Sequence, residues 1–297
     1  MTRPRPILPG RRYLITRRTR LREMWLVPSD DVNRIVGYCT AIAAERTGVQ
    51  LVAGVAMSNH LHDVVIDHEA RIPEFTHWRH TFIAKCIKHR FRVEENLWST
   101  AGTCYTELLD DDAVMDKIGY TLANPVAARL VKRRRDWPGF ITSVRDLRGG
   151  AYTFERPSFF SADMPDTATL TMRRPNIFPE LTDNELVTRA AQDLRRRELD
   201  ERHYAECRGL KFLGPARVRA VVPGTSPKGP APHSDIRPLF ATRNPAHLAN
   251  AIQRIYDFWG EYDQTRADRI DSDSTAPFPA GAYAVHRFLG LPVQDFT

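Results

Sequence analysis

The strongest constraint on the fold is a pair of apolar strands separated by a short polar break. Residues 49–57 are almost entirely apolar, and residues 60–67 resume an apolar pattern after Ser58-Asn59. Runs of this length, rich in β-branched residues and joined by a short break, are typical of a β-hairpin. Side chains alternate between the two faces of a strand, so the hairpin also predicts which residues of 60–67 point the same way.

The segments on either side of the hairpin predict a β-α-β-β-α-β-α order. Ser29 is a suitable N-cap for the first helix and Gly48 a suitable stop, and Asp110 to Asp112 cap the last helix. The expected elements are a short strand within 11–19 around Tyr-Leu-Ile, helix 30–46, strands 49–57 and 60–67, helix 73–92, strand 104–109, and helix 113–132 with an interruption at Pro125. This order predicts an α+β fold, a ferredoxin-like split βαβ with an antiparallel sheet, helices packed on one face and one added helix.

The pattern weakens after residue 150, which favours a division into residues 1–150 and 151–297. We expect the second region to be an accessory one, mainly helical or irregular. Leu181-Thr182-Asp183 predicts the start of a helix over 183–206, and residues 246–262 predict another. Residues 223–238, rich in Pro and Gly, indicate a linker.

The charge of the chain is unevenly distributed. The formal net charge is +7. Residues 1–150 carry 24 Lys and Arg against 17 Asp and Glu, whereas residues 151–297 carry 19 of each. The excess indicates a polyanionic partner that contacts the first half, with ordinary solubility charge as the alternative. The neutral second half argues against a large second nucleic-acid surface.

Cysteine usage and hydropathy bear on the compartment. The four cysteines, Cys39, Cys86, Cys104 and Cys207, lack CxxC spacing, which argues against a disulfide framework or a zinc cluster. No apolar signal segment or bilayer-spanning run is evident. We therefore expect a cytoplasmic protein with access to DNA and no contact with membranes.

Two histidines of the hairpin suggest a metal site. His60 and His62 are alternate residues of the second strand, so their side chains project from one face while Leu61 points the other way. Two neighbouring imidazoles on a rigid strand can share a divalent ion. The alternative is a pair of ordinary strand histidines.

Tyr120 and Asn124 form a second candidate pair. They are four residues apart, which places them on one helix face, and the Asn124 amide oxygen suits Mg²⁺ or Mn²⁺. Two histidines and one amide oxygen would leave positions for water and a phosphate oxygen, and Tyr120 could then attack the phosphorus. The alternatives are a packing tyrosine with an Asn-Pro stop signal, and Tyr105 as a rival nucleophile without a ligand at helical spacing.

Basic residues flank the first strand and the tyrosine helix. We expect them to contact DNA phosphates, although edge-strand protection and stabilisation of the helix dipole are alternatives. The candidates are Arg11, Arg12, Arg17, Arg18, Arg20, Arg22, Lys132, Arg133 and Arg134.

Three separated motifs resemble the HUH single-tyrosine transposases, in the branch of REP-associated tyrosine transposases. The opening strand from Ile7 to Thr16 resembles that of the branch. Ser58-Asn59-His60-Leu61-His62 resembles its HUH motif, and the run from Tyr120 to Ala128, followed by Asp136-Trp137-Pro138-Gly139, resembles its tyrosine helix and exit. The resemblance covers about residues 6–145.

The resemblance implies an HUH nuclease domain in residues 1–150 that acts on single-stranded DNA near a hairpin. His60, His62 and Asn124 would hold Mg²⁺ or Mn²⁺, and Tyr120 would form a 5′-phosphotyrosine and release a 3′-OH, which allows later strand transfer. No nucleotide cofactor is expected, and the protein would act as a monomer or a homodimer.

One residue departs from the family pattern. Asp63 follows the second histidine, where an apolar or small residue is usual. By alternation it points away from the metal site, and a buried carboxylate there needs a partner. The alternatives left open are a domesticated DNA-binding protein that does not cut, and a replication initiator or relaxase of the same class.

Overall fold

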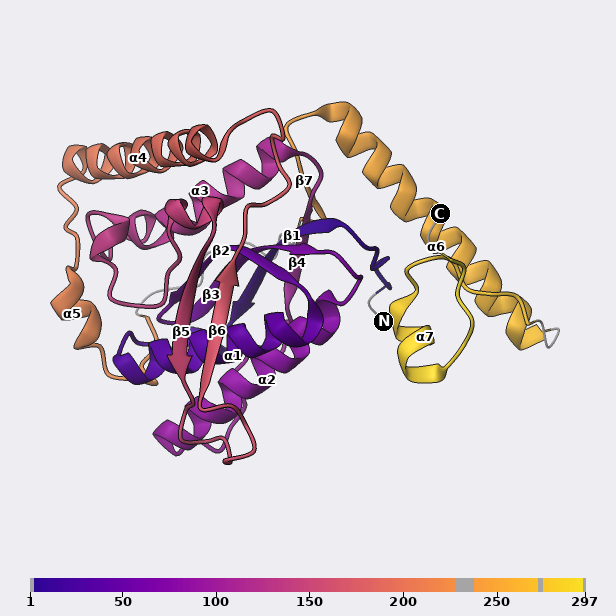
Figure 1. Ribbon diagram of the computed structural model, residues 1–297, viewed down its shortest axis with the longest axis horizontal. Coiled ribbons are helices and arrows are strands. Elements are labelled where there is room, and N and C mark those ends of the chain that lie inside the picture. The colour runs from indigo at the N-terminus through magenta and orange to yellow at the C-terminus, as the bar shows by residue number, and fades with distance from the viewer. Residues whose placement is uncertain (1–2, 228–237, 272–274, 296–297) are drawn as a thin grey trace.

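The computed structural model describes residues 3–227, 238–271 and 275–295. Its centre is a sheet of order β2-β3-β1-β4-β7 (Figure 1). The sheet strands are β1 (Arg11–Arg18), β2 (Gln50–Met57), β3 (His60–Asp67), β4 (Cys104–Leu108) and the short β7 (Phe240–Ala241). The first four strands pair antiparallel in the order of a ferredoxin-like split βαβ, and β7 adds to β4 in parallel. The predicted α+β class and the predicted hairpin are therefore confirmed.

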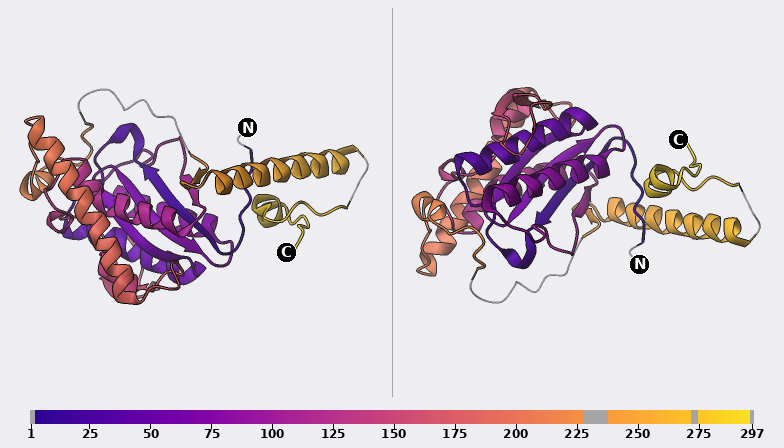
Figure 2. Two further views of the ribbon diagram at one scale, coloured as in Figure 1. Left: turned by 90° about the horizontal axis from the view of Figure 1, so that it is seen from above. Right: turned by 90° about the horizontal axis from the view of Figure 1, so that it is seen from below.

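Helices cover both faces of this sheet, not one face as expected. Helices α1 (Asp30–Thr47) and α2 (Ile72–Phe91) pack on one face, and α3 (Asp111–Ala127) packs on the other (Figures 1 and 2). The physical reason lies in β3, which is apolar on both sides. Leu61 and Val65 join the core under α1 and α2, whereas Val64 and Ile66 join the core under α3.

Helix α3 ends earlier than expected. It continues through Pro125 but stops at Ala127, five residues before the predicted end at Lys132. Ala128 still bonds back to the Asn124 carbonyl, and Arg129 then adopts a left-handed conformation with φ 55°. A non-glycine residue in that region cannot continue an α-helix, so the chain turns there.

Asp63 has the partner that its burial requires. Its carboxylate accepts two hydrogen bonds from the Arg79 guanidinium on α2, at 2.5 and 3.1 Å, and both side chains are fully buried. Arg79 Nε also donates to Thr40 Oγ1 on α1. A Cβ on Gly54 of β2 would lie 2.9 Å from Asp63 Oδ1, so glycine there leaves room for the carboxylate. The ion pair joins the sheet to both helices on the face away from His62.

The region after residue 150 packs against the first half. Strands β5 (Gly150–Glu155) and β6 (Thr167–Met172) form a hairpin that lies against α1, and α4 (Asp183–Cys207) lies along α3. The predicted cap of α4 is confirmed, because Thr182 and Glu185 form a reciprocal capping box. The β5–β6 hairpin was not predicted. In the sequence of β6, threonines alternate with apolar residues, which is a strand signal, and in the structure the apolar residues are the buried ones.

The remaining elements are α5 (Pro215–Arg219), α6 (Pro245–Asp271) and α7 (Tyr283–Leu289), with the 3₁₀ turns η1 (Arg20–Arg22), η2 (Arg134–Asp136) and η3 (Val144–Arg148). Helix α6 is longer than the predicted 246–262 and projects from the body, with α7 beside it (Figure 2). Most of the predicted linker, residues 228–237, lies outside the described residues. Among the described helices, none combines the length and apolarity needed to cross a bilayer.

Candidate functional site

His60 and His62 lie together on the α3 face of the sheet, as alternation predicted. Their ring centroids are 4.7 Å apart, and the rings are nearly perpendicular. In the sheet register, Arg18 of β1 lies opposite His60, and Thr16 lies opposite His62. The strand pairing therefore surrounds the two imidazoles with a hydroxyl and a guanidinium.

Each imidazole is oriented by a hydrogen bond at its Nδ1 atom. His60 Nδ1 lies 2.7 Å from Asn59 Oδ1, and the Asn59 amide nitrogen donates to the Arg22 carbonyl, so the amide oxygen faces the ring. That oxygen can only accept, which places the proton of His60 on Nδ1 and leaves the lone pair on Nε2. Thr16 Oγ1 lies 2.9 Å from His62 Nδ1 and can accept its proton in the same way. Thr16 and Asn59 thus act as positioning residues.

Helix α3 brings Tyr120 to the histidines. The ring centroids of Tyr120 and His62 are 5.4 Å apart in an edge-on arrangement. Tyr120 is 38% exposed, whereas His62 is only 5% exposed. The helix is positioned because its apolar face, which includes Ile118 and Leu122, is buried against the sheet. The Tyr120 side chain therefore lies partly open to solvent, beside a buried histidine.

The electrostatics favour neutral imidazoles. The pKa of His60 is lowered to about 4, mainly by burial and also by the nearby positive charge of Arg18, while a side-chain hydrogen bond to Asn124 partly opposes both effects. Burial also lowers the pKa of His62, as do His60 and Arg18. Neutral imidazole is the form that binds metal ions.

Tyr120 experiences opposing effects. Burial raises the pKa of its hydroxyl, while the Arg18 guanidinium and a side-chain hydrogen bond from Asn124 lower it. Arg18 is exposed and takes part in no ion pair within the described part of the chain. Its positive charge is therefore available both to a phenolate and to an incoming phosphate.

The donor set suits a hard divalent ion held by few protein ligands. Within residues 3–227, 238–271 and 275–295, no group of three or more His, Cys, Asp or Glu side chains could hold a metal. His60 and His62 offer two Nε2 lone pairs, and Asn124, which interacts with both His60 and Tyr120, offers an amide oxygen. Three such ligands would leave room for water and a phosphate oxygen.

The predicted basic residues do not gather at one place. Several pair within the protein: Arg11 with Glu107, Arg12 with Asp111, Arg20 with Glu95, and Arg134 with the carbonyls of residues 141 and 142. Arg17 lies over the ring of Trp98 on the opposite face from His62. Arg11 and Arg12 occupy the end of β1 farthest from the histidines. Of the set, Arg18 is the residue at the site, while Lys132 and Arg133 are exposed beyond α3.

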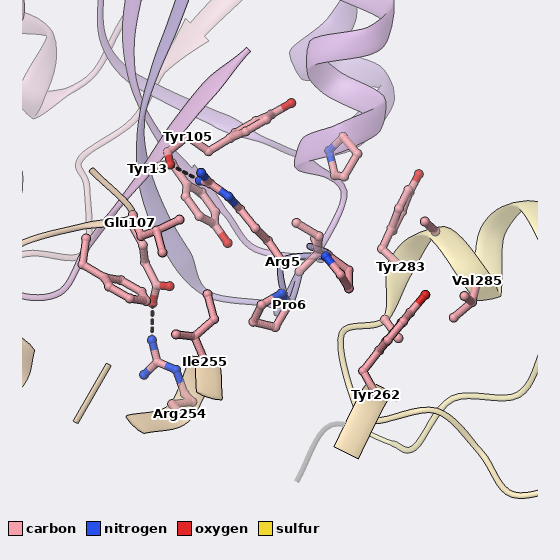
Figure 3. Close-up of a pocket in the computed structure, with 17 residues that line it drawn as sticks. Arg5, Pro6, Tyr13, Tyr105, Glu107, Arg254, Ile255, Tyr262, Tyr283 and Val285 are labelled. Carbon is pink, nitrogen blue, oxygen red and sulfur yellow. Dashed lines mark hydrogen bonds and ion pairs between the residues drawn. The ribbon is translucent and has the colours of Figure 1, made fainter. Parts of the chain in front are cut away.

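Tyr105, the rival nucleophile, lies away from the histidines. Its hydroxyl is 2.5 Å from Thr76 Oγ1, and burial raises its pKa. It lines a cavity of about 220 Å³ between the N-terminal segment, β4, α6 and α7, together with Tyr13, Tyr262 and Tyr283 (Figure 3). No metal-ligating pair of histidines lines that cavity. Tyr105 is thus a packing residue of the opposite sheet face.

Two side chains of the candidate site received no role in the sequence analysis. Thr16 and Asn59 appear there only as parts of motifs, yet they hold the two imidazoles. The signal for Asn59 was its position directly before His60. The signal for Thr16 was weaker, because it depends on the register between β1 and β3, which places Thr16 opposite His62.

Comparison with known proteins identifies partial structural similarities. No protein-family model matches the chain, and no curated protein matches it. A REP-associated tyrosine transposase bound to a REP hairpin is similar at a TM-score of 0.42 and 17% identity, over 50% of this chain and 85% of that one. A transposase candidate from Deinococcus radiodurans R1 is similar at a TM-score of 0.27 and 22% identity, over 35% of this chain and 84% of that one. Each covers half of this chain or less, and the function of this chain is therefore inferred from its own side chains.

Proposed function

We propose that this protein is a transposase-like endonuclease and strand-transferase that cuts single-stranded DNA with Tyr120. The single observation that carries the proposal is the juxtaposition of an accessible tyrosine with two oriented histidines, 5.4 Å from ring to ring between Tyr120 and His62. The motif resemblance to REP-associated tyrosine transposases supports the same activity, with a hairpin next to the cleaved strand. Asp63 gives the non-cleaving alternative no support, because Arg79 neutralises it on the opposite face of the sheet.

The side chains divide the reaction between them. His60, His62 and Asn124 would hold Mg²⁺ or Mn²⁺, which supplies Lewis-acid polarisation of the scissile phosphate. The Tyr120 oxygen forms a bond to phosphorus while the bond from phosphorus to the 3′ oxygen breaks. The phenolic proton leaves to water, and the 3′ oxygen takes up a proton to become a 3′-OH. Arg18 stabilises the negative charge on the tyrosine oxygen and on the phosphate.

The 5′-phosphotyrosine would keep the energy of the broken ester. A 3′-OH from a second strand can attack it, which joins the strands and restores the Tyr120 hydroxyl. Cleavage and joining therefore need no nucleotide cofactor, and the same site would serve both steps.

Metal removal gives the direct test. We expect labelled single-stranded DNA that contains hairpins to form a denaturation-resistant adduct with the protein in Mn²⁺. The adduct should be absent in EDTA and restored by excess Mn²⁺, because polarisation of the phosphate requires the ion. The measurement is a denaturing gel, with duplex DNA of the same sequence as the control. Tight binding of the hairpin with no adduct in any metal would instead identify a binding protein.

Substitution of Thr16 tests the positioning of the metal ligands. Thr16→Val removes the hydroxyl that lies 2.9 Å from His62 Nδ1, with little change in shape. Loss of such a supporting hydrogen bond typically costs about 10–100-fold in metal affinity. We expect Mn²⁺ binding, followed by calorimetry, to weaken by that factor, and Thr16→Ser to restore it. Equal affinity in Thr16→Val and the wild type would contradict the assigned role of Thr16.

A further inference from the structure

Residues 151–297 have no net charge, but their basic and acidic residues are not evenly distributed. Residues 207–227 contain four basic residues and no acidic residue. We call residues 208–219 the basic strap; its cations are Arg208, Lys211, Arg217 and Arg219. Although the net charge of residues 151–297 is zero, this segment is locally positive and can attract an anionic partner.

The cations of the basic strap face solvent. All four side chains belong to exposed residues, and within the described residues none of them forms an ion pair. Val218, between Arg217 and Arg219, is 1% exposed and packs with Val131 and Trp137. Since Val218 points inward, its two arginine neighbours are directed outward from α5.

The strap is attached to the elements that build the site. The Leu213 and Gly214 amides donate to the carbonyls of Arg129 and Leu130, just after the helix that carries Tyr120. The cluster around Val218 also contains Met57 and Val126, which lie three residues before His60 and two residues after Asn124. The exposed Lys132 and Arg133 lie in the same exit segment of α3.

The chain beyond the strap reaches the other border of the site. Met24 donates to the Thr225 carbonyl, and the Ser226 hydroxyl donates to the Leu21 carbonyl. The loop that contains Leu21 and Met24 follows Arg18 and is bonded to the turn before His60, because Leu26 donates to the Ser58 carbonyl. Residues 208–226 thus run from the end of the tyrosine helix to the end of the histidine hairpin.

We propose that the basic strap is a second phosphate-binding surface, which holds the DNA strand that leaves the site at Tyr120. Outward-facing cations without ion-pair partners bind phosphates without reading sequence. This inference rests on the proposed function for the choice of DNA as the polyanion. Part of the DNA interface would then lie in residues 151–297, although that half of the chain has no net charge.

The experiment compares Arg217→Gln/Arg219→Gln with the wild type on two single-stranded DNA probes. One probe is about 6 nucleotides long and fills only the site, and the other is about 30 nucleotides long. Fluorescence anisotropy at several salt concentrations gives Kd and its salt slope. We expect the long probe to bind about tenfold more weakly to the variant, with a salt slope lower by about 1.4, since each lost contact to single strands contributes about 0.7. The short probe should bind equally.

A matched control removes the same charge elsewhere. Arg195 and Arg266 are exposed on α4 and α6, and no ion pair of either occurs in the described structure. Arg195→Gln/Arg266→Gln should leave both probes unaffected. Equal weakening by the two double variants, or no weakening by the strap variant, would overturn the strap assignment.

Formation of the Tyr120 adduct tests the proposed function separately from the strap assignment. At saturating long probe, the strap variant should form the Tyr120 adduct in Mn²⁺ at the rate of the wild type. A wild-type protein that binds neither probe and forms no adduct would overturn the proposed function, and the strap assignment with it. Thermal unfolding of both variants, expected to match the wild type, shows that the fold is unchanged.

Discussion

Tyr120→Phe is expected to lower formation of the covalent protein–DNA adduct by at least about 10³-fold, as loss of a nucleophile does. Phenylalanine keeps the ring that lies beside His62 but lacks the oxygen that bonds to phosphorus. DNA binding should stay within about twofold, because phosphate contacts supply most of the affinity. Quantified denaturing gels in Mn²⁺ measure the adduct, and anisotropy measures the binding.

Tyr105→Phe is the matched control for this prediction. It removes one hydroxyl from the opposite face of the sheet, where that hydroxyl bonds to Thr76. The expected result is a normal adduct rate and a loss of stability of about 1 kcal/mol. An adduct that persists in Tyr120→Phe and vanishes in Tyr105→Phe would reverse the assignment of the nucleophile.

Arg79→Met is expected to lower the free energy of unfolding by about 3–5 kcal/mol, the usual cost of leaving one partner of a buried ion pair alone. The Asp63 carboxylate would lose both guanidinium bonds in a site from which water is excluded, and Thr40 would lose its donor. Urea unfolding followed by circular dichroism measures the change. Arg90→Met, which breaks the exposed pair with Asp31, should cost no more than about 1 kcal/mol.

A double substitution separates loss of the ion pair from loss of volume. Asp63→Leu in the Arg79→Met background replaces both charges by apolar side chains, and such replacements are often neutral or stabilising. We expect the double variant to recover most of the lost stability. A double variant as unstable as Arg79→Met alone would show that the arginine acts through packing and not through its charge.

The same ion pair explains how the fold accommodates an acidic residue directly after the second histidine. The sequence indicates that Asp63 points away from the histidines and needs a partner. Local spacing cannot identify that partner, because Arg79 is on a different element and reaches Asp63 only when α2 packs on the sheet. Space for the carboxylate comes from Gly54 on a third element.

Much of the candidate site could be predicted because it depends on local periodicity. Alternation along β3 places His60 and His62 on one face, and helical spacing places Tyr120 one turn from Asn124. Helix α3 meets the histidines because the sheet has a second apolar face. The prediction of helices on one face did not account for that second face. The accessory elements were harder to predict. The β5–β6 hairpin is held by Tyr152, Phe154, Leu170 and Met172, which pack into the core of α1 and α2, a contact between segments distant in the chain. The exact end of α3 depends on the left-handed residue Arg129.

By itself, the sequence determined the elements of the first half, the face on which each candidate ligand lies, and the caps at Ser29, Asp110 and Thr182, because these depend on interactions between residues close in the chain. Only the tertiary structure decided which basic residues pair internally and which remain available. It also decided that Thr16 orients His62, and that residues 208–226 run from one border of the site to the other. Those features depend on strand register and on contacts between distant segments, whose free energies are realised only when the whole core is packed.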